Sequence, residues 1–421
     1  MKIAHIVGNR PQFIKLSLLY RAWQRKCADR ALIIHTGQHF SDNMSAIFFE
    51  EFGIPPPDYQ LNINSLPHGE MIGRMLIGID AVLATEKPDA VIVYGDTNTT
   101  LAGALAGKKR NIPVVHVEAG IRTGKEDMPE ESNRYLTDRL ADVNFACTYL
   151  GVENLLKEGF VGGEARSGAV GLRTGDEGMG PGGGVPDRSE DAGMAGGVRP
   201  KTGDGMMSAG GAKKGSGTIQ SLVYNTGDLM LDAALLFKDK AREQSTLLRD
   251  LSLQERPFVL ATIHRAENVE DPAVLAGILQ ALHSIHQDIP VVVPVHPKTR
   301  QMIDRMGIPL SLHITPPLGY LDMLALVQAC RNVVTDSGGL SREAFFFHKP
   351  SLVVMQHPFW PEIFVHGPSL PAAAAPEALL SQWRALVHAD GTGRPFQTEI
   401  FGDGAAAEKI TDILLTVLKS F

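Results

Sequence analysis

The amino-acid sequence predicts an α/β protein built from two doubly wound domains. Short apolar segments alternate with helix-forming segments along its 421 residues, which is typical of parallel sheets covered by helices. The strand-like segments are apolar at successive positions, so we expect strands that are buried on both faces. A chain of this length is long for one domain and natural for two.

The segment from residue 90 to residue 117 is the clearest strand–helix–strand unit. Ala90 to Val93 is an apolar run, and a helix rich in Ala and Leu is expected from about Thr99 to Lys108. Pro113 follows that helix, and Val114 to Val117 forms the next strand. Such units hold their strands in parallel, and open parallel sheets bind ligands beyond the carboxyl ends of the strands. Functional residues are therefore expected directly after the strands.

The other apolar runs define the predicted parts of the chain. Residues 1–160 are predicted to form the N-terminal domain and residues 223–400 the C-terminal domain. Residues 401–421 contain an amphipathic helix that could pack back on the N-terminal domain. The remaining strands are expected at Lys2–Val7, Ala31–His35, Ala141–Ala146, Phe258–Thr262, Val291–Val295, Asn332–Thr335 and Ser351–Met355.

Residues 161–222 differ sharply in composition from the rest of the chain. About a third of them are Gly, against a usual share of about 7%, and none is aromatic. Such a segment cannot bury enough apolar surface to offset its loss of conformational entropy. We predict a flexible insertion or linker, which either has no function of its own or serves as a regulatory or partner-binding arm.

Composition also argues against several classes of function. The formal net charge of -7 speaks against a general nucleic-acid or membrane surface. Cys27, Cys147 and Cys330 are scattered, so neither a disulfide framework nor a metal site is expected, and a cytoplasmic location fits. The apolar run at the N-terminus is too short for a signal peptide, and no segment is long and apolar enough to span a bilayer.

Four carboxylates near the central unit could supply an acid and a base. Asp96 and Glu118 follow its two strands, and Glu130 and Glu131 come shortly after. Proton transfer uses groups whose pKa values neighbours push apart. Alternatively, Asp96 belongs to a turn, and Glu130 and Glu131 are first-turn acids of a helix after Pro129. Glu118 would be costly to bury without partners, which favours a chemical role there.

Small and basic residues after other strands indicate a phosphate ligand. Ser337, Gly338 and Gly339 lie between a strand and a helix, where a phosphate could approach backbone N–H groups. Basic residues that converge on one cleft would suit a diphosphate; otherwise they are surface groups or helix caps, and the glycines form an ordinary turn. The basic residues near strand ends are Arg10, Lys15, His264, Arg265 and His296.

Eight motifs run through both domains and omit the Gly-rich segment: GNRPQFIK (8–15), TGQH (36–39), YGDTNTTLAGALA (94–106), HVEAGIRT (116–123), PEESNRYLTD (129–138), TIHRAEN (262–268), PVHP (294–297) and TDSGGLSREA (335–344). Together they resemble the non-hydrolysing UDP-N-acetylglucosamine 2-epimerases. The variants RPQFIK, HTGQHF, NMSAIFFEEFGI and AFFFHKP are most similar to a branch that acts on UDP-2,3-diacetamido-2,3-dideoxyglucuronic acid.

This resemblance implies a GT-B architecture, in which two Rossmann-like domains form an active-site cleft between them. It implies inversion at C2 of a UDP-sugar by elimination and re-addition of UDP, without a metal or nicotinamide cofactor, in a protein expected to be a homodimer. The catalytic residues would be Asp96, Glu118, Glu130 and His264. The substrate-binding residues would be Arg10, Lys15, Arg134, Arg265, His296, Ser337, Gly338, Gly339 and Glu343, with Glu343 on the ribose.

Two features depart from the family pattern. A loop that usually carries Arg-Asp-x-Thr-Glu reads MQHPFWPE at residues 355–362, so the contacts to sugar or phosphate are expected to differ. The Gly-rich segment lies near the expected domain connection. The alternatives are a hydrolysing relative that releases UDP, a GT-B glycosyltransferase, and a non-catalytic UDP-sugar binding protein. The altered loop favours the last of these, and the set Asp96, Glu118, Glu130 and His264 opposes it.

Overall fold

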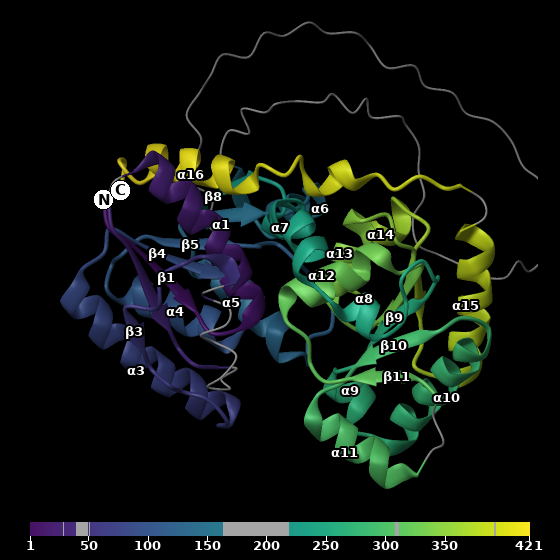
Figure 1. Ribbon diagram of the computed structural model, residues 1–421. Helices are drawn as coiled ribbons and strands as arrows, with labels where there is room; N and C mark the ends of the chain where they lie inside the picture. Colours follow the sequence, from purple (N-terminus) through teal and green to yellow (C-terminus); the bar gives the residue numbers. More distant parts are fainter. Residues whose placement is uncertain (28, 39–48, 50, 163–218, 308–310, 391–392) are drawn as a thin grey trace, which may run out of the picture.

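Two parallel sheets with helices on both faces lie side by side (Figure 1). The computed structural model describes residues 1–27, 29–38, 49, 51–162, 219–307, 311–390 and 393–421. The alternation of strands and helices confirms the predicted fold class. Most of the Gly-rich segment, residues 163–218, lies outside the described residues.

The first sheet has eight strands in the described part of the chain, in the order β3-β2-β1-β4-β5-β6-β8-β7. Its neighbouring strands are parallel, and β1, β2 and β4 are buried along their whole length, as their apolar runs predict. The strands are β1 (Ile3–Val7), β2 (Ala31–His35), β3 (Tyr59–Gln60), β4 (Ala90–Tyr94), β5 (Val114–Val117), β6 (Val143–Ala146), β7 (Phe160–Gly162) and β8 (Ile219–Asn225). The helices are α1 (Arg10–Lys26), α3 (His68–Glu86), α4 (Asn98–Lys109), α5 (Pro129–Leu140) and α6 (Tyr149–Lys157).

The second sheet has six described strands, in the order β11-β10-β9-β12-β13-β14, and these are parallel as well. They are β9 (Val259–Thr262), β10 (Val291–Pro294), β11 (His313–Thr315), β12 (Asn332–Thr335), β13 (Ser351–Val354) and β14 (Leu370–Ala372). The helices are α7 (Leu229–Gln244), α8 (Leu247–Asp250), α9 (Ala266–Val269), α10 (Pro272–Asp288), α11 (Pro297–Met306), α12 (Tyr320–Ala329), α13 (Gly338–Phe346), α14 (Glu362–Val365), α15 (Pro376–Asp390) and α16 (Ala406–Val417), with a 3-10 turn at Thr398–Phe401.

Strand β8 corrects the boundary that composition suggests at residue 223. The strand begins at Ile219 and pairs with β6 and β7, so residues 219–225 complete the first sheet rather than open the second domain. The sequence does not reveal the first residues of this strand, because one of the side chains that face the interior is polar. Ser221 is buried, and its hydroxyl accepts a hydrogen bond of 2.9 Å from the Asn144 amide on β6. That pairing is visible only in three dimensions.

Each sheet reverses its strand order near its middle, and these places position the site; the first sheet also reverses at its edge, where β8 lies between β6 and β7. In the first sheet β1 lies between β2 and β4, and in the second sheet β9 lies between β10 and β12. Ligands of open α/β sheets bind beyond the carboxyl ends of the strands at such a reversal. The residues that follow there are Asn9-Arg10 and Gly95-Asp96 in the first sheet, and His264-Arg265 and Asp336-Ser337 in the second.

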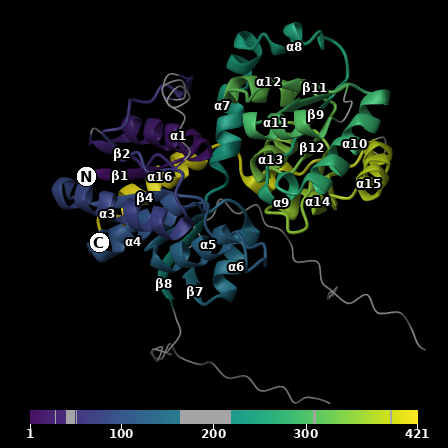
Figure 2. The same ribbon diagram turned by 90° about the horizontal axis from the view of Figure 1, so that it is seen from below.

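The C-terminal helix α16 packs on α1 of the first half (Figures 1 and 2). Lys26 at the end of α1 lies 2.7 Å from Asp412 and 2.8 Å from Glu408. The start of α16 is held by Asp232 on α7, whose carboxylate accepts the N–H groups of Ala406 and Ala407 at 3.1 and 2.8 Å. The chain therefore returns from the second half to the first.

The hydrophobic core is shared by the two halves. Its largest cluster runs from β1 and α1 through α7 to α12, α13 and α16. Phe52 from the first half, Phe237 on α7 and Tyr320 on α12 meet with ring centroids 5.5 to 6.0 Å apart. Such aromatic pairs contribute about 0.5–1.5 kcal/mol each beyond their buried area. Among the described helices, none has the length and apolar character needed to cross a membrane.

Candidate functional site

The Gly95-Asp96 turn after β4 is held from several sides. Gly95 has a φ of +66°, which favours glycine. Its carbonyl oxygen lies 2.7 Å from Nε2 of the buried His116, and the Asn133 amide donates to the Asp96 carbonyl at 2.9 Å. The Asp96 carboxylate lies 2.5 Å from Arg134 on α5 and keeps 25% of its side chain exposed. Asp96 is therefore fixed in place but still accessible.

Glu118 lies beside this turn in a strained backbone conformation. Its φ is +77°, which is uncommon for a residue other than glycine and costs about 1–3 kcal/mol. One carboxylate oxygen lies 2.5 Å from Nζ of Lys15 and 3.0 Å from the Arg342 guanidinium. Burial acts to raise the pKa of Glu118, but the charges of Arg342 and Lys15 outweigh it and lower the pKa to about 2. Glu118 thus stays ionised between two cations.

Arg342 links Glu118 to a fourth charged residue. The same guanidinium nitrogen lies 2.7 Å from Asp228, which also caps α7 by accepting the Met230 N–H at 2.8 Å. We call Lys15, Glu118, Asp228 and Arg342 the interdomain charge cluster, because Arg342 on α13 belongs to the second half. Neither Arg342 nor Asp228 was expected as a site residue. Arg342 gave one signal in the sequence, because it and Glu343 are the two charged residues in the helix Gly338–Phe346, which otherwise consists of small and apolar residues.

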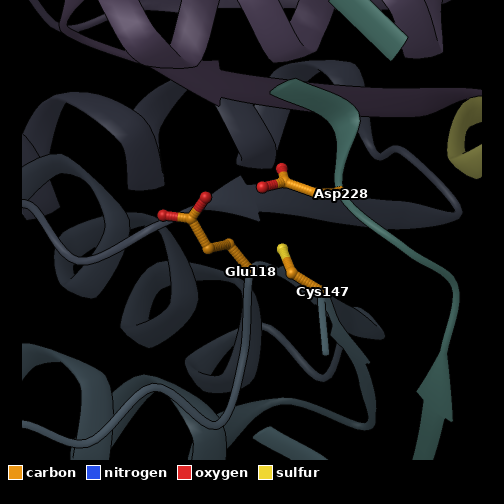
Figure 3. A group of neighbouring side chains, drawn as sticks. All are labelled: Glu118, Cys147 and Asp228. Atoms are coloured by element: carbon orange, nitrogen blue, oxygen red, sulfur yellow. The ribbon is translucent and has the colours of Figure 1, made fainter. Parts of the chain in front are cut away.

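Glu118, Cys147 and Asp228 bring possible metal-ligand atoms within 4.8 Å of one another, from the ends of the neighbouring strands β5, β6 and β8 (Figure 3). The surroundings do not suit a metal ion. Lys15 and Arg342 already lie against the carboxylates, and burial raises the pKa of the Cys147 thiol well above its usual range. A cation here would have to displace positive charges that the fold holds in place.

The two acids that begin α5 have different surroundings. Glu131 is buried, accepts the N–H groups of Thr123 and Gly124 at 2.9 and 3.1 Å, and lies 2.5 Å from Arg134. It therefore orders the loop before α5 and aims Arg134 at Asp96. Glu130 is half-buried and has no ion pair among the described residues. The first-turn position predicted for both acids is correct, and only Glu130 is left available for chemistry.

Asp336 organises the end of β9 in the second sheet. Its buried carboxylate accepts the backbone N–H groups of His264 and Arg265 at 3.0 and 2.9 Å and the Asn268 amide at 3.0 Å. Burial acts to raise the pKa of Asp336, but the hydrogen bond from His264 and the other donors lower it. The His264 ring lies 3.1 Å from this carboxylate and is 58% exposed. His264 is therefore anchored at its base and open to solvent.

The N-terminus of α13 lies beside this loop. Ser337 caps the helix by accepting the Leu340 N–H at 3.2 Å. The N–H groups of Gly338 and Gly339 have no partner among the described residues, so they remain available to an anion. A Cβ on Gly338 would lie 2.8 Å from Cδ2 of Phe359, whereas one on Gly339 would meet only the Ser337 hydroxyl, at 3.7 Å. The absence of a side chain at Gly338 therefore leaves space for the Phe359 ring.

The loop at residues 355–362, which departs from the expected family pattern, contributes the rings of Phe359 and Trp360. The Phe359 ring centroid lies 4.6 Å from the guanidinium carbon of Arg134 and 4.6 Å from that of Arg265. Trp360 lies under Arg342 at 4.0 Å. Aromatic faces attract cations at such distances. The loop therefore contacts arginines of both halves of the molecule.

Arg10 and Glu343 face each other across the same boundary. Arg10 on α1 donates to the Leu318 carbonyl at 2.9 Å. Burial raises the pKa of Glu343 to about 7, against the opposing charges of Arg10 and Arg342. Glu343 is therefore an acid that titrates near neutral pH.

The predicted residues are not all connected. One chain of contacts runs from Asp96 through Arg134 and Phe359 to Arg265. A second joins Lys15 and Arg342 through Glu118. Asp336 lies against both His264 and Arg265. His296 differs, because it is exposed and accepts the Lys298 N–H at 3.3 Å as the cap of α11. Its described contact is that of a helix cap, which is the alternative to a phosphate ligand that we considered for the basic residues.

Comparison with known proteins points to one family. The UDP-N-acetylglucosamine 2-epimerase family matches residues 22–167 and 215–415. The chain is 38% identical to the UDP-2,3-diacetamido-2,3-dideoxy-D-glucuronate 2-epimerase of Pseudomonas aeruginosa over 98% of this chain and 99% of the relative. It is 32% identical to the UDP-N-acetylglucosamine 2-epimerase of Methanocaldococcus jannaschii over 98% and 99%.

The fold agrees as well. The crystal structure of the Methanocaldococcus jannaschii UDP-GlcNAc 2-epimerase in complex with UDP-GlcNAc and UDP superposes with a TM-score of 0.78 and covers 99% of this chain and 100% of that one. The family match, the two GT-B-like halves and the acids and arginines at their facing strand ends lead to one conclusion: the chain belongs to the UDP-N-acetylglucosamine 2-epimerase family.

Proposed function

We propose that the chain inverts C2 of a UDP-2-acetamido sugar without hydrolysing it. The observation that carries the proposal is the 3.0 Å contact between Arg342 on α13 and Glu118 after β5. It brings the helix N-terminus suited to a diphosphate against the strand ends that hold the acids. An enzyme that expels UDP and moves a proton at the neighbouring carbon needs these two groups in one cleft.

Proton transfer at C2 is assigned to carboxylates of the first half. Asp96 is partly exposed and fixed by Arg134, and Glu130 is free of ion pairs among the described residues, so both are suitable acid–base groups. Glu118, with a pKa of about 2, is a weak base in this arrangement. Its basicity would rise if Arg342, which belongs to the other half, moved away, while Lys15 would still lie against the carboxylate.

Departure and return of UDP are assigned to the second half. His264 and Arg265 follow β9, and the N–H groups of Gly338 and Gly339 lie at the start of α13. Together these donors would stabilise the negative charge that develops on the diphosphate as the C1–O bond breaks. Arg10 and Glu343 would hold the nucleotide, with Glu343 accepting from the ribose hydroxyls.

The substrate proposed is the diacetamido uronate rather than UDP-GlcNAc. The Pseudomonas aeruginosa relative that is named for the diacetamido uronate is 38% identical to this chain, whereas the archaeal UDP-N-acetylglucosamine 2-epimerase is 32% identical. The loop at residues 355–362 also departs from the usual pattern of the family. We also propose a cytoplasmic homodimer that needs no metal or nicotinamide. The isolated cysteines support the compartment, and the homodimer stays a prediction from the resemblance.

Incubation with each nucleotide sugar, followed by NMR, tests the activity. We expect an equilibrium mixture of C2 epimers in which the sugar remains attached to UDP, reached faster with the diacetamido uronate. Accumulation of free sugar and UDP would instead identify a hydrolysing enzyme. Binding without any change in the sugar would identify a binding protein and contradict the proposal.

Substitution of the proposed proton-transfer acids should reduce turnover with little effect on folding. Asp96→Asn leaves Arg134 paired with Glu131, and Glu130→Gln breaks no described ion pair. Each should lower kcat by about 10²- to 10⁴-fold with a nearly unchanged melting temperature. Glu126→Gln, an exposed change in the preceding loop, is the matched control and should stay within about twofold. Near-normal kcat in Asp96→Asn would remove Asp96 from the mechanism.

Nucleotide binding should depend on pH through Glu343. Its carboxylate accepts ribose hydroxyls better when ionised, and burial raises its pKa to about 7. Binding therefore favours loss of the proton, so affinity for a UDP-sugar should rise from pH 6 to pH 8, by up to about tenfold. Calorimetry at both pH values checks this, and Glu343→Gln should bind with a flatter pH profile. An unchanged profile in the variant would contradict the assignment.

A further inference from the structure

Phe359 lies where the two halves of the proposed site meet. Its ring contacts Arg134 of the first half and Arg265 of the second, each at 4.6 Å between guanidinium carbon and ring centroid. The same ring packs on Gly338 at the start of α13, since an added Cβ there would lie 2.8 Å from Cδ2. One side chain thus touches both halves and the helix end whose N–H groups have no partner in the described part of the chain.

The two arginines differ in how far their charge is balanced. Arg134 lies 2.5 Å from Asp96 and 2.5 Å from Glu131. Arg265 lies 4.0 Å from Glu267, a residue that Lys125 approaches more closely, at 2.9 Å. Among the described residues, the other contacts of its side chain are a hydrogen bond to the Asp336 carbonyl and the face of Phe359. Arg265 therefore presents a poorly neutralised cation beside the start of α13.

Stacking on an aromatic face suits this cation. A guanidinium that lies over a ring keeps the donors in its own plane free for a planar or tetrahedral anion. The ring also stabilises the charge without supplying a counter-ion that a diphosphate would have to displace. A carboxylate in the same place would compete with the ligand.

We propose that Phe359 is a positioning residue for the leaving diphosphate. Its ring holds Arg265 beside the anion that binds at the start of α13, and its contact with Arg134 holds the first half next to the same anion. This inference rests on the proposed function, since it assumes a UDP-sugar in the cleft. It gives the altered loop a role, because its ring orients two arginines of the protein.

The geometry also defines the opposing interpretation. A ring packed on Gly338 could occupy the space of the diphosphate and act as a plug that must leave before UDP binds. The two interpretations predict opposite changes in affinity when the ring is removed. If the ring orients the arginines, its removal weakens UDP binding; if it blocks the site, its removal strengthens binding.

The test compares Phe359→Leu with Phe359→Tyr in the full-length protein. Leu keeps an apolar side chain of similar length but has no aromatic face, whereas Tyr keeps the ring. UDP affinity is measured by calorimetry, kcat and KM with the nucleotide sugar, and folding by the melting temperature. We expect Leu to weaken UDP binding by between about twofold and thirtyfold, the range of one to two such contacts, and to raise KM more than it lowers kcat. Tyr should restore both values to within about twofold of the original.

The outcomes separate this inference from the proposed function. Equal UDP affinity in the original protein and Phe359→Leu, or tighter binding by Leu, overturns the positioning role. Failure of Tyr to restore affinity overturns it too, because a merely structural role would then account for the loss. An original protein that binds UDP but epimerises neither sugar contradicts the proposed function alone, and the binding comparison still decides the role of Phe359.

Discussion

The rest of the site depends on the interdomain charge cluster of Lys15, Glu118, Asp228 and Arg342. Two cations and two carboxylates balance one another in a buried place where any one of them alone would be costly. Because Arg342 lies on α13 and Lys15 on α1, balance is reached only when the two halves come together. Removing one partner of such a buried pair typically costs about 3–5 kcal/mol, since the other charge stays buried. The cluster therefore makes the facing of the two halves specific.

That constraint sets the chemistry available on each side of the cleft. Glu118 loses basicity by holding two cations. The acid–base groups that we propose are therefore the partly exposed Asp96 and Glu130, which has no ion pair among the described residues. Arg342 in turn brings the start of α13 close to them. The strained backbone at Glu118 fits the same interpretation, because residues held in sparsely populated conformations cluster at functional sites. Motion of α13 away from β5 would separate Arg342 from Glu118 and raise the basicity of that carboxylate.

The sequence predicted what depends on local order along the chain. Asp96, Glu118, His264 and Ser337 were predicted as site residues because each lies one or two positions after a strand, and parallel sheets gather such residues at one edge. Arg342 was not predicted, because its partner Glu118 lies 224 positions away and a charge in a helix does not by itself show which strand end it will meet. Phe359 was seen only as a departure from a pattern, since its meaning depends on two arginines from different halves. Strand β8 was cut short because its inward Ser221 is satisfied by Asn144 on another strand.

The central claim is that carboxylates of the first half exchange the proton at C2 while the second half holds UDP. Epimerisation in D₂O followed by NMR of the product tests it most directly. An enzyme acid that returns the proton to the opposite face can exchange with solvent while the intermediate is bound. The account predicts that inverted product carries deuterium at C2. Inverted product that keeps its original C2 hydrogen would contradict elimination and re-addition, whatever the similarity of this chain to its relatives.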